Sequence, residues 1–278
     1  MRWAARLNIS KKSMLQHGEE IALENCDIPI KFRRHPKARR LTLRVSSTDR
    51  SAIVTVPPYC SDKETISFLE NHRNWLFEQF EKLPEAAPFK HESIMPLRGV
   101  DHKLIFAGQS RGKGVIWIEN DKADQDKKVE ALTESCETQT PQTETNSLPE
   151  IHINGTEHFA PRRLTRWLID QARKDLQERS KWHSENLGLS YNKIMIKDQR
   201  SRWGSCSSRG ILSYSWRLIL APSDVLDYVA AHEVAHLAEM NHGPNFWALV
   251  EQTLPTYKTA KSWLSDNGSD LHRYGAKS

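Results

Sequence analysis

An acidic segment between residues 119 and 150 constrains the fold more than any other feature of this sequence. It holds nine Asp and Glu residues against three lysines, and its second half, residues 138–149, is rich in Thr, Gln, Ser and Pro without a helical or strand period. Such a composition buries too little apolar surface to offset the entropy lost on ordering. We therefore expect residues 119–150 to form a flexible linker or a surface insertion. The chain then divides into an N-terminal tail (1–25), a β-rich region (26–118), the acidic segment and a C-terminal domain (151–278).

The length and the cysteines narrow the class of protein further. A chain of 278 residues with 38% apolar residues has the size of one large or two small domains with a real core. No C-x-x-C pair occurs, which argues against a thiol redox pair, a cysteine zinc knuckle and a disulfide-stapled mini-protein, and favours a reducing compartment. The cysteines are Cys26, Cys60, Cys136 and Cys206.

Targeting signals are not evident in the sequence. No apolar run approaches the roughly 18 residues of a membrane span, and residues 1–10 lack the continuous apolar stretch of a signal peptide. We expect a cytoplasmic protein without a membrane partner, and no pattern indicates a particular oligomeric state.

The positive charge is concentrated before the acidic segment. The whole chain carries +5, so the residues outside the acidic segment carry +11, and residues 31–44 hold seven Lys and Arg without an acid. One interpretation is that this run binds nucleic acid through phosphates. The other is that it forms the solvated face of a strand, because Leu41, Leu43 and Val45 alternate with polar residues.

The region before the acidic segment is predicted to be mostly β with one helix. A capping box, Ser61-x-x-Glu64, predicts the start of this helix, which extends towards Pro84. Strands rich in β-branched or alternating apolar residues are expected at 41–45, 53–56, 94–97, 103–106 and 115–118.

The C-terminal half is predicted to be α+β. Pro161 opens a helix with apolar residues at helical spacing, and Gly188 is a plausible stop. Further helices are expected from Asp224 to Met240, with Ser223 as N-cap, and from Pro244 to Leu254. Strands are expected at 191–197 and 211–220, joined by a polar loop at 200–210.

The helix expected at 224–240 contains the sequence His232-Glu-Val-Ala-His236. Residues at i and i+4 lie on one face of a helix, so both imidazoles can converge on one metal ion, while Glu233 is offset by about 100° towards a metal-bound water. This pattern is typical of zinc-assisted hydrolysis.

His242 is the expected third ligand. The helix must end near Met240 for His242 to turn back, and Asn241 tolerates the left-handed conformation that such a stop requires. Three histidines and a water would complete an open catalytic tetrahedron. Glu251, on the following helix, is the competing third ligand.

Less specific interpretations remain for these residues. The motif could be polar residues on an amphipathic helix, although burying a Glu and two His without partners costs several kcal/mol. It could also hold a structural zinc ion in an interaction module without turnover, although no fourth His or Cys lies nearby in sequence. We interpret Cys206 and three tryptophans near the motif as packing residues; these are Trp203, Trp216 and Trp247.

Three further segments accompany this motif: Arg202-Trp-Gly-Ser-Cys-Ser-Ser, Trp216-Arg-Leu and Asn241-His-Gly-Pro-Asn-Phe-Trp247. With these segments, the chain resembles the YgjP-like metallopeptidases, which are relatives of the SprT-like zinc proteases in the zincin-like superfamily. The resemblance implies an α+β fold in which a zincin-like domain, its HExxH helix packed on a small sheet, follows the β-rich region. It implies Zn²⁺ bound by His232, His236 and His242, and Glu233 as the catalytic carboxylate.

The expected activity is hydrolysis of a peptide or protein substrate, with Glu233 as general base towards a zinc-activated water. Candidates for stabilising the oxyanion are Tyr214, Arg202 and His183. The strand expected at 211–220 could hold an extended peptide at its edge, or it could equally be a core strand that carries Trp216 and Leu218. The alternative is a basic nucleic-acid-associated protein whose zinc site is secondary, including a protease that acts on DNA-bound proteins.

Overall fold

The computed structural model describes residues 20–23, 26–46, 49–108, 114–119, 148–199 and 201–276. The chain forms two compact units, one of residues 1–86 with 276–278 and one of residues 87–275. The division therefore falls near residue 86 and not at 118, because the strands between 94 and 119 pair with a strand that follows the acidic segment.

The first unit is built on a four-stranded sheet with the order β1-β2-β4-β3. β2 and β4 are parallel, whereas β1 pairs with β2 and β3 pairs with β4 in antiparallel register. Side chains alternate along β2, so that Ile30 and Phe32 are buried whereas Arg33 is exposed. The bounds are β1 Glu20–Leu23, β2 Cys26–Arg34, β3 Thr42–Ser46 and β4 Ser51–Val56.

Two helices, and not the single expected one, follow this sheet: α1 (Asp62–Asn71) and α2 (Arg73–Glu81). The chain breaks at His72, whose backbone leaves the helical region and whose ring Nδ1 donates to the carbonyl oxygen of Phe68 at 2.8 Å. Leu69 of α1 and Leu76 of α2 are buried with the inward residues of the sheet in one core. Hydrophobic spacing alone does not reveal the break because both helices bury residues in the same core.

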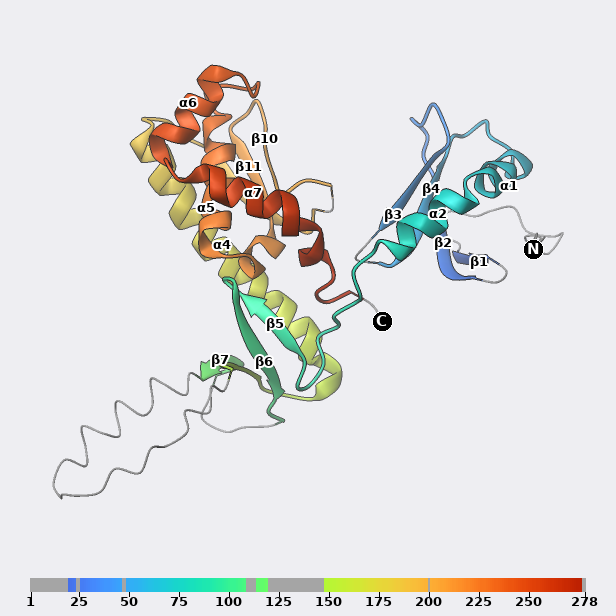
Figure 1. Ribbon diagram of the computed structural model, residues 1–278, viewed down its shortest axis with the longest axis horizontal. Helices are drawn as coiled ribbons and strands as arrows, with labels where there is room; N and C mark the ends of the chain where they lie inside the picture. Colours follow the sequence, from blue (N-terminus) through green and yellow to red (C-terminus); the bar gives the residue numbers. More distant parts are fainter. Residues whose placement is uncertain are drawn as a thin grey trace. The chain divides into compact units, whose positions relative to one another are not determined.

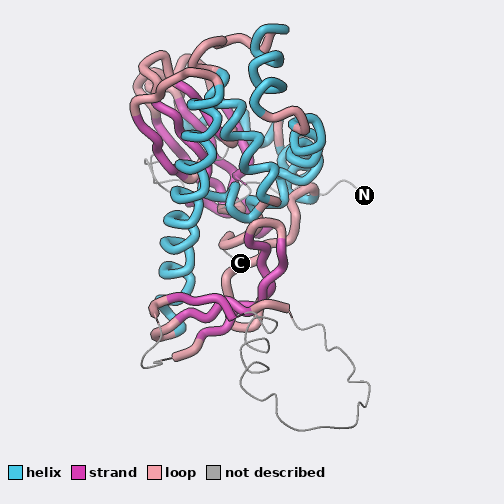
Figure 2. The backbone as a smooth tube through the Cα atoms, turned by 90° about the vertical axis from the view of Figure 1, so that its left-hand side faces the viewer, coloured by secondary structure: helices cyan, strands magenta, loops and turns pink. Residues whose placement is uncertain are grey.

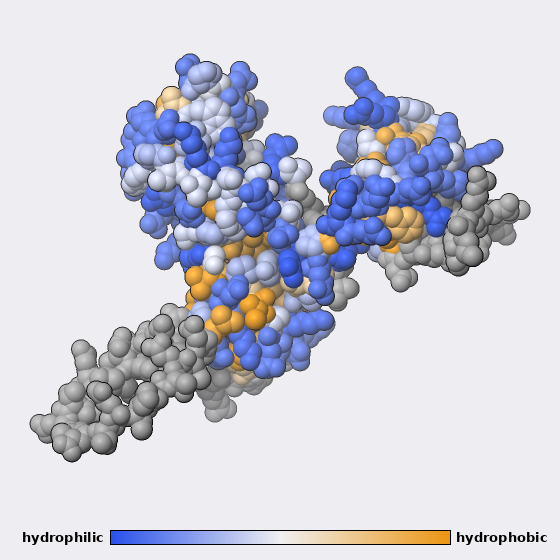
Figure 3. Space-filling model, in the orientation of Figure 1, coloured by the Kyte–Doolittle hydropathy of each residue, from blue (hydrophilic) through white to orange (hydrophobic). Residues whose placement is uncertain are grey.

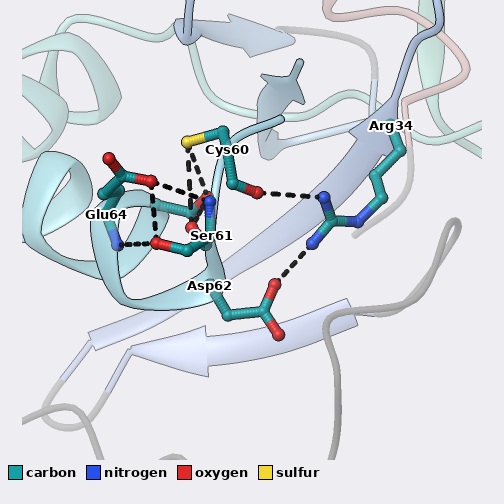
Figure 4. Close-up of polar contacts among 6 residues, drawn as sticks. Arg34, Cys60, Ser61, Asp62 and Glu64 are labelled. Carbon is teal, nitrogen blue, oxygen red and sulfur yellow. Dashed lines mark hydrogen bonds and ion pairs between the residues drawn. The ribbon is translucent and has the colours of Figure 1, made fainter. Parts of the chain in front are cut away.

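The predicted capping box at the start of α1 is present. The Ser61 hydroxyl accepts a hydrogen bond from the Glu64 backbone N–H, and a Glu64 carboxylate oxygen accepts one from the Ser61 backbone N–H (Figure 4). Arg34 extends this arrangement, since its guanidinium donates to the Cys60 carbonyl oxygen at 3.2 Å and to the Asp62 carboxylate at 2.5 Å. The cap thereby ties the end of β2 to the first turn of α1.

The second unit contains a four-stranded sheet with the order β5-β6-β8-β7. β7 and β8 flank the acidic segment in sequence and pair with each other in antiparallel register, Glu119 opposite Glu150. The acidic segment is therefore an insertion between two neighbouring strands of one sheet and not a linker between the two units; residues 120–147 lie outside the described residues. The bounds are β5 Ile94–Leu97, β6 Val100–Phe106, β7 Ile116–Glu119 and β8 Glu150–Ile153.

A tight hairpin turn joins β5 to β6. Arg98 and Gly99 both have positive φ, as a two-residue hairpin turn of the primed type requires. The Arg98 guanidinium donates to both carboxylate oxygens of Asp175, at 2.7 and 2.9 Å, and so fixes the turn to α4. Apolar surface lies over the sheet in Figure 3, and its strands carry the exposed side chains of Ile94 and Val100.

The longest helix of the described residues, α4 (Ala160–Asn186), follows the short 3-10 helix η1 (Glu157–Phe159) and confirms the helix predicted from Pro161. Its 27 residues span about 40 Å. Figures 1 and 2 show it running from the four-stranded sheet towards the remaining helices of the unit. The predicted apolar stripe faces the core: Leu164, Leu168, Ala172 and Leu176 are completely buried.

A small sheet with the order β10-β11-β9 lies beside α4 and α5. Its strands are β9 (Lys193–Lys197), β10 (Gly204–Cys206) and β11 (Ile211–Ser215). The strand predicted at 211–220 is thus too long, because residues 216–220 form the 3-10 helix η2 (Trp216–Leu220), all of whose side chains are buried. A short apolar run that is buried on every side carries no periodic signal that separates strand from helix.

Three helices and a 3-10 helix complete the second unit: α5 (Ser223–Ala235), α6 (Pro244–Thr253), α7 (Tyr257–Asn267) and η3 (Gly268–His272). α5 begins after Pro222 as N-cap, so the prediction that Ser223 is the N-cap was one residue late. Within the described residues, no helix combines the length and the apolar character that a membrane crossing requires.

Candidate metal centre

The site is built on the last turn of α5, a helix enclosed by the rest of the second unit. Val225, Val229, Ala230 and Val234 are almost completely buried, and the helix packs against α4, η2 and β10. Such packing leaves the backbone of the helix little freedom, so side chains on its final turn are rigidly placed. The HExxH sequence lies at this end.

α5 ends at Ala235, five residues before the predicted end at Met240, and His236 is its C-cap. The chain then turns tightly: the backbone N–H groups of Ala238 and Glu239 both donate to the Ala235 carbonyl oxygen, at 3.1 and 3.0 Å. This early end is the reason that His242 returns to the helix, because the turn follows the second histidine directly. The helix does stop before His242, as predicted, but it ends at Ala235 and not near Met240.

The three predicted histidines meet at this turn. Ring nitrogens of His232, His236 and His242 all lie within 4.8 Å of one another, and the Nε2 atoms of His232 and His242 are 3.1 Å apart. The Nδ1 atom of His236 donates to the Glu239 carbonyl oxygen at 2.9 Å, so its Nε2 atom carries the lone pair. A backbone carbonyl that orients an imidazole in this way is typical of metal-binding histidines.

Burial favours the neutral form of the first two imidazoles. It lowers the pKa of His232 to about 3, with smaller contributions from His236, His242 and Lys261, and it also lowers the pKa of His236. Neutral imidazole is the form that binds metal ions. The donor set therefore fits a cation with a preference for nitrogen ligands, and the buried Nδ1 atom of His232 has no hydrogen-bond partner among the described residues.

Glu233 lies beside this cluster in a site that water barely reaches. Its side chain is 4% exposed, and burial raises its pKa to about 8, against the charge of Arg202, which lowers it. Gly204 of β10 approaches it so closely that a Cβ atom at position 204 would fall 2.7 Å from the Glu233 carboxyl carbon. Only glycine leaves room for the carboxyl group where it stands.

A cleft of about 710 Å³ opens in front of the three histidines. Tyr228, one helical turn before His232, forms part of its wall with its ring edge-on to His232, and burial raises the pKa of its hydroxyl to about 12. The cleft is lined by Ser201, Arg202, Trp203, Gly204, Ser205, Cys206, Tyr228, Val229, His232, Glu233, His236, Met240, His242 and Leu264. Tyr228 was not among the predicted site residues, although its spacing of four residues from His232 places it on the same helix face.

The competing third ligand, Glu251, lies outside the cluster. Its carboxylate is exposed on α6 and lies 3.4 Å from the Lys258 ammonium group. This carboxylate forms a salt bridge with a lysine on the next helix. Among the described residues, the group that can share a cation with His232 and His236 contains His242 and not Glu251.

Two of the three residues predicted as oxyanion candidates are structural. Tyr214 is completely buried with its hydroxyl 2.9 Å from Ser180 Oγ, and His183 is completely buried between Thr253 and Asp227. Arg202 alone of the three lines the cleft. Residue type alone does not separate a polar residue of the cleft from a polar residue of the core, because Tyr214 and His183 form their hydrogen bonds within the core.

Cys206 and Trp203 line the cleft, whereas Trp216 and Trp247 pack elsewhere in the unit. Trp247 stacks on Tyr257 and His242, Trp216 is buried with its indole N–H donating to Asp198, and Trp203 stacks on His272. Burial, with the Glu233 charge second, raises the pKa of Cys206, so its thiol is not activated as a nucleophile. The cleft residues that remain available for chemistry are those of the histidine cluster, Glu233, Tyr228 and Arg202.

The fold and the site together define a mixed α+β protein with a candidate metal centre beside a buried carboxyl group. The family model described as YgjP-like, metallopeptidase domain, matches residues 39–267. The chain therefore belongs to the YgjP-like family, and membership in a metallopeptidase family implies a bound metal ion.

A search of curated proteins found no significant match. A search of solved structures found similarity to the crystal structure of the metallopeptidase zymogen of Pyrococcus abyssi abylysin, with 20% identity and a TM-score of 0.31, covering 36% of this chain and 97% of that chain.

Proposed function

We propose that the protein is a zinc-dependent peptidase in which His232, His236 and His242 hold the ion and Glu233 is the general base. The observation that carries this proposal is the convergence of three imidazoles within 4.8 Å beside a buried carboxyl group in an open cleft. Three nitrogen ligands fit Zn²⁺ and leave a position free for water. In this reading the second unit is a zincin-like domain, with the HExxH helix packed on the small sheet.

Zinc supplies Lewis acidity towards water and the scissile carbonyl when it is bound. Glu233 then accepts the proton of the attacking water at a carboxylate oxygen and passes it to the leaving amine. Burial raises the pKa of Glu233 to about 8 and so makes its carboxylate a stronger base, while the charges of Arg202 and of any bound dication act to keep the group ionised.

Two groups are suited to stabilise developing negative charge on the substrate oxygen. Arg202 brings a permanent positive charge to the cleft, and Tyr228 brings a hydroxyl that stays protonated at neutral pH. Tyr214 and His183 are not part of this proposal, because both are sealed in the core.

An extended peptide is the proposed substrate, held along β10. The predicted role of strand 211–220 as the holding edge was wrong, because β11 lies between β9 and β10 and both of its edges are paired. β10 is an edge strand of this sheet and lines the cleft, so its backbone groups can add a substrate strand next to Glu233.

The first test is the metal content of the protein purified without added zinc. We expect about one zinc ion per protein chain to be bound at the three histidines of the wild type. His236→Ala and His242→Ala should lose this ion. Glu251→Gln is the matched control and should retain the metal. Loss of zinc in Glu251→Gln with retention in His242→Ala would overturn the ligand assignment.

The second test is cleavage of a peptide library by Glu233→Gln. This change keeps the size of the side chain and removes its ability to take a proton, so zinc should stay bound while hydrolysis is abolished. Glu239→Gln, in the turn after the helix, is a control that should cleave like the wild type. Hydrolysis by Glu233→Gln at the wild-type rate would refute the mechanism.

A second candidate function, nucleic-acid binding, rests on the sheet of the first unit. Arg33 of β2 and Arg44 of β3 are exposed and alternate with core residues, and Arg39 and Arg40 are exposed in the connection between these strands. Arg34 is not part of this group, because its guanidinium binds the Cys60 carbonyl oxygen and the Asp62 carboxylate at the start of α1.

A salt titration of DNA binding tests this second function. Binding that weakens steeply with salt and is lost when Arg33, Arg39, Arg40 and Arg44 are changed to Gln would support it. Equal binding by this variant and the wild type would reject it.

A further inference from the structure

The cleft in front of the three histidines has little negative charge of its own. Among the described residues that line it, Glu233 is the one carboxylate, and Arg202 lines the same cleft with a permanent positive charge. A divalent ion at the histidines would add two further positive charges. A cleft with an excess of one charge attracts ligands of the opposite charge. Acidic peptides are therefore favoured over basic ones as ligands.

A second cation, Lys261, lies next to this cleft. Lys261 is an exposed residue of α7, and its ammonium group lies over the Trp247 ring, 3.9 Å from the centroid. The centroid of this ring is 6.0 Å from the ring centroids of both His232 and His242. Leu264, which lies one turn further along the same face of α7, lines the cleft. A single ring therefore separates the ammonium group from two of the proposed zinc ligands.

Stacked aromatic rings hold the Trp247 side chain, and with it the ammonium group, in place. Trp247 stacks on the buried ring of Tyr257, with centroids 5.4 Å apart and an angle of 15° between the planes. Tyr257 in turn stacks on Tyr228 of the cleft wall. A cation over the face of a tryptophan ring is attracted by the negative charge of that face. The Lys261 side chain is therefore less mobile than a lysine that extends into solvent.

The charge of Lys261 is not neutralised by a carboxylate within the described part of the chain. Lys258, three residues earlier on α7, differs in this respect, because its ammonium group lies 3.4 Å from the Glu251 carboxylate. A lysine held by an aromatic ring keeps N–H groups that can donate to a carboxylate. Of these two lysines, Lys261 is the one that can bind a carboxylate of a ligand without first breaking an ion pair.

We propose that Lys261 makes the cleft selective for peptides that carry an Asp or Glu side chain close to the scissile bond. This inference rests on the proposed peptidase function and names its substrate class. An extended peptide advances about 3.3 Å per residue, so a carboxylate within about three residues of the scissile bond can reach the ammonium group. Lys261 determines specificity and takes no part in the bond-breaking step.

A comparison of matched peptides tests the proposal. One Glu is placed at each of three positions on either side of the scissile bond, and the same position carries Gln in the reference peptide. At the best position, the wild type should cleave the Glu peptide with a kcat/KM about 3- to 10-fold higher, the size expected of one charge-assisted contact at the edge of a cleft. This ratio should fall as salt is added.

Substitutions on α7 assign the preference to one side chain. Lys261→Gln should bring the ratio to about 1, and Lys261→Glu should bring it below 1. Lys258→Gln, which removes a lysine charge from the same helix, is the matched control and should keep the wild-type ratio. A ratio of about 1 at every position in the wild type, or an unchanged ratio in Lys261→Gln, would overturn the proposal. Zinc content and thermal unfolding confirm that each variant is folded.

Binding to zinc-loaded Glu233→Gln separates this proposal from the proposed peptidase function. Fluorescence anisotropy of the same peptides, labelled with fluorescein, should show tighter binding of the Glu peptide, and Lys261→Gln in this background should remove the difference. A preference in binding without cleavage by the wild type would support the selectivity and refute the peptidase. Cleavage without a preference would do the opposite, and failure of both peptides to bind would overturn the selectivity.

Discussion

A single methyl group at position 204 tests how closely the site is packed around Glu233. In Gly204→Ala the new Cβ atom would stand 2.7 Å from the Glu233 carboxyl carbon, so the carboxyl group must move. A misplacement of about 1 Å at a reacting group costs up to about 100-fold in rate. We expect kcat/KM on a cleaved peptide to fall about 10- to 100-fold while zinc content stays at the wild-type level.

The control for this prediction is another glycine beside a proposed ligand. Gly243 follows His242, has an extended backbone with φ of −78°, and would place a Cβ atom in open space. Gly243→Ala should therefore cleave peptide like the wild type. A wild-type rate in Gly204→Ala would show that Glu233 either tolerates displacement or has no part in the reaction.

At the scale of single residues, the spacing along one helix could be used to predict which residues lie together, whereas contacts between different elements could not be predicted from the sequence. The i, i+4 pair His232 and His236 and the following His242 could be grouped from sequence, and the structure brings their rings together. Their role as zinc ligands stays a prediction. The close approach of Gly204 to Glu233 joins a strand to a helix across 29 positions of sequence, so no local pattern reports it.

At the scale of elements, a polar network joins the three helices around the site. Asp227 of α5 accepts hydrogen bonds from Arg179 of α4, at 2.5 and 3.0 Å, and from His183 Nε2 at 2.8 Å. His183 Nδ1 lies 2.8 Å from the hydroxyl of Thr253 on α6. Burial acts to raise the pKa of Asp227, but the hydrogen bonds and charges of His183 and Arg179 outweigh it and lower the pKa.

Removing the charge of Asp227 should loosen these helices in a pH-dependent way. A carboxylate with a lowered pKa in the folded state stabilises the fold above its unfolded pKa of about 3.9, and this contribution is lost as pH falls through the folded value. Asp227→Asn should therefore lower the free energy of unfolding at pH 7 by about 2 kcal/mol or more. The difference from the wild type should shrink below about pH 4.

Urea unfolding at several pH values measures this effect. Asp170→Asn is the control, since Asp170 pairs with Arg173 on the exposed side of α4 and such surface pairs contribute about 0–1 kcal/mol. A loss in Asp227→Asn that is no larger than in Asp170→Asn, or that does not change with pH, would contradict the prediction.

The elements that sequence predicted best are those with one buried face. The stripe of α4 was readable because Leu164, Leu168 and Ala172 alternate with polar residues at helical spacing. η2 was not, because its whole sequence is buried. The early end of α5 was missed for a related reason: Leu237 continues the apolar spacing past Ala235, and the turn is held by backbone hydrogen bonds that sequence does not encode visibly.

At the scale of the whole molecule, the composition of the acidic segment did not indicate its place in the fold. Composition shows that such a segment cannot be core, and it does not show which strands lie on either side. The pairing of β7 with β8 makes it an insertion in the second unit, and the boundary between units falls near residue 86 instead. Long-range strand pairing of this kind has no local sequence signal.

Each unit has a core of its own, and this predicts two separate unfolding transitions. The buried cluster of the first unit lies within residues 28–80 and that of the second within residues 89–271, so the two share no side chain. Leu69→Ala and Leu164→Ala remove equivalent side chains that are 1% and 0% exposed, and each should lower the stability of its own unit by about 2–5 kcal/mol. Differential scanning calorimetry should show a shift of a different transition in each variant.

Zinc bound at the three histidines should raise the temperature of only the transition that Leu164→Ala lowers, because binding to one folded unit stabilises that unit alone. A single transition that is shifted by both substitutions would mean that the two units unfold together.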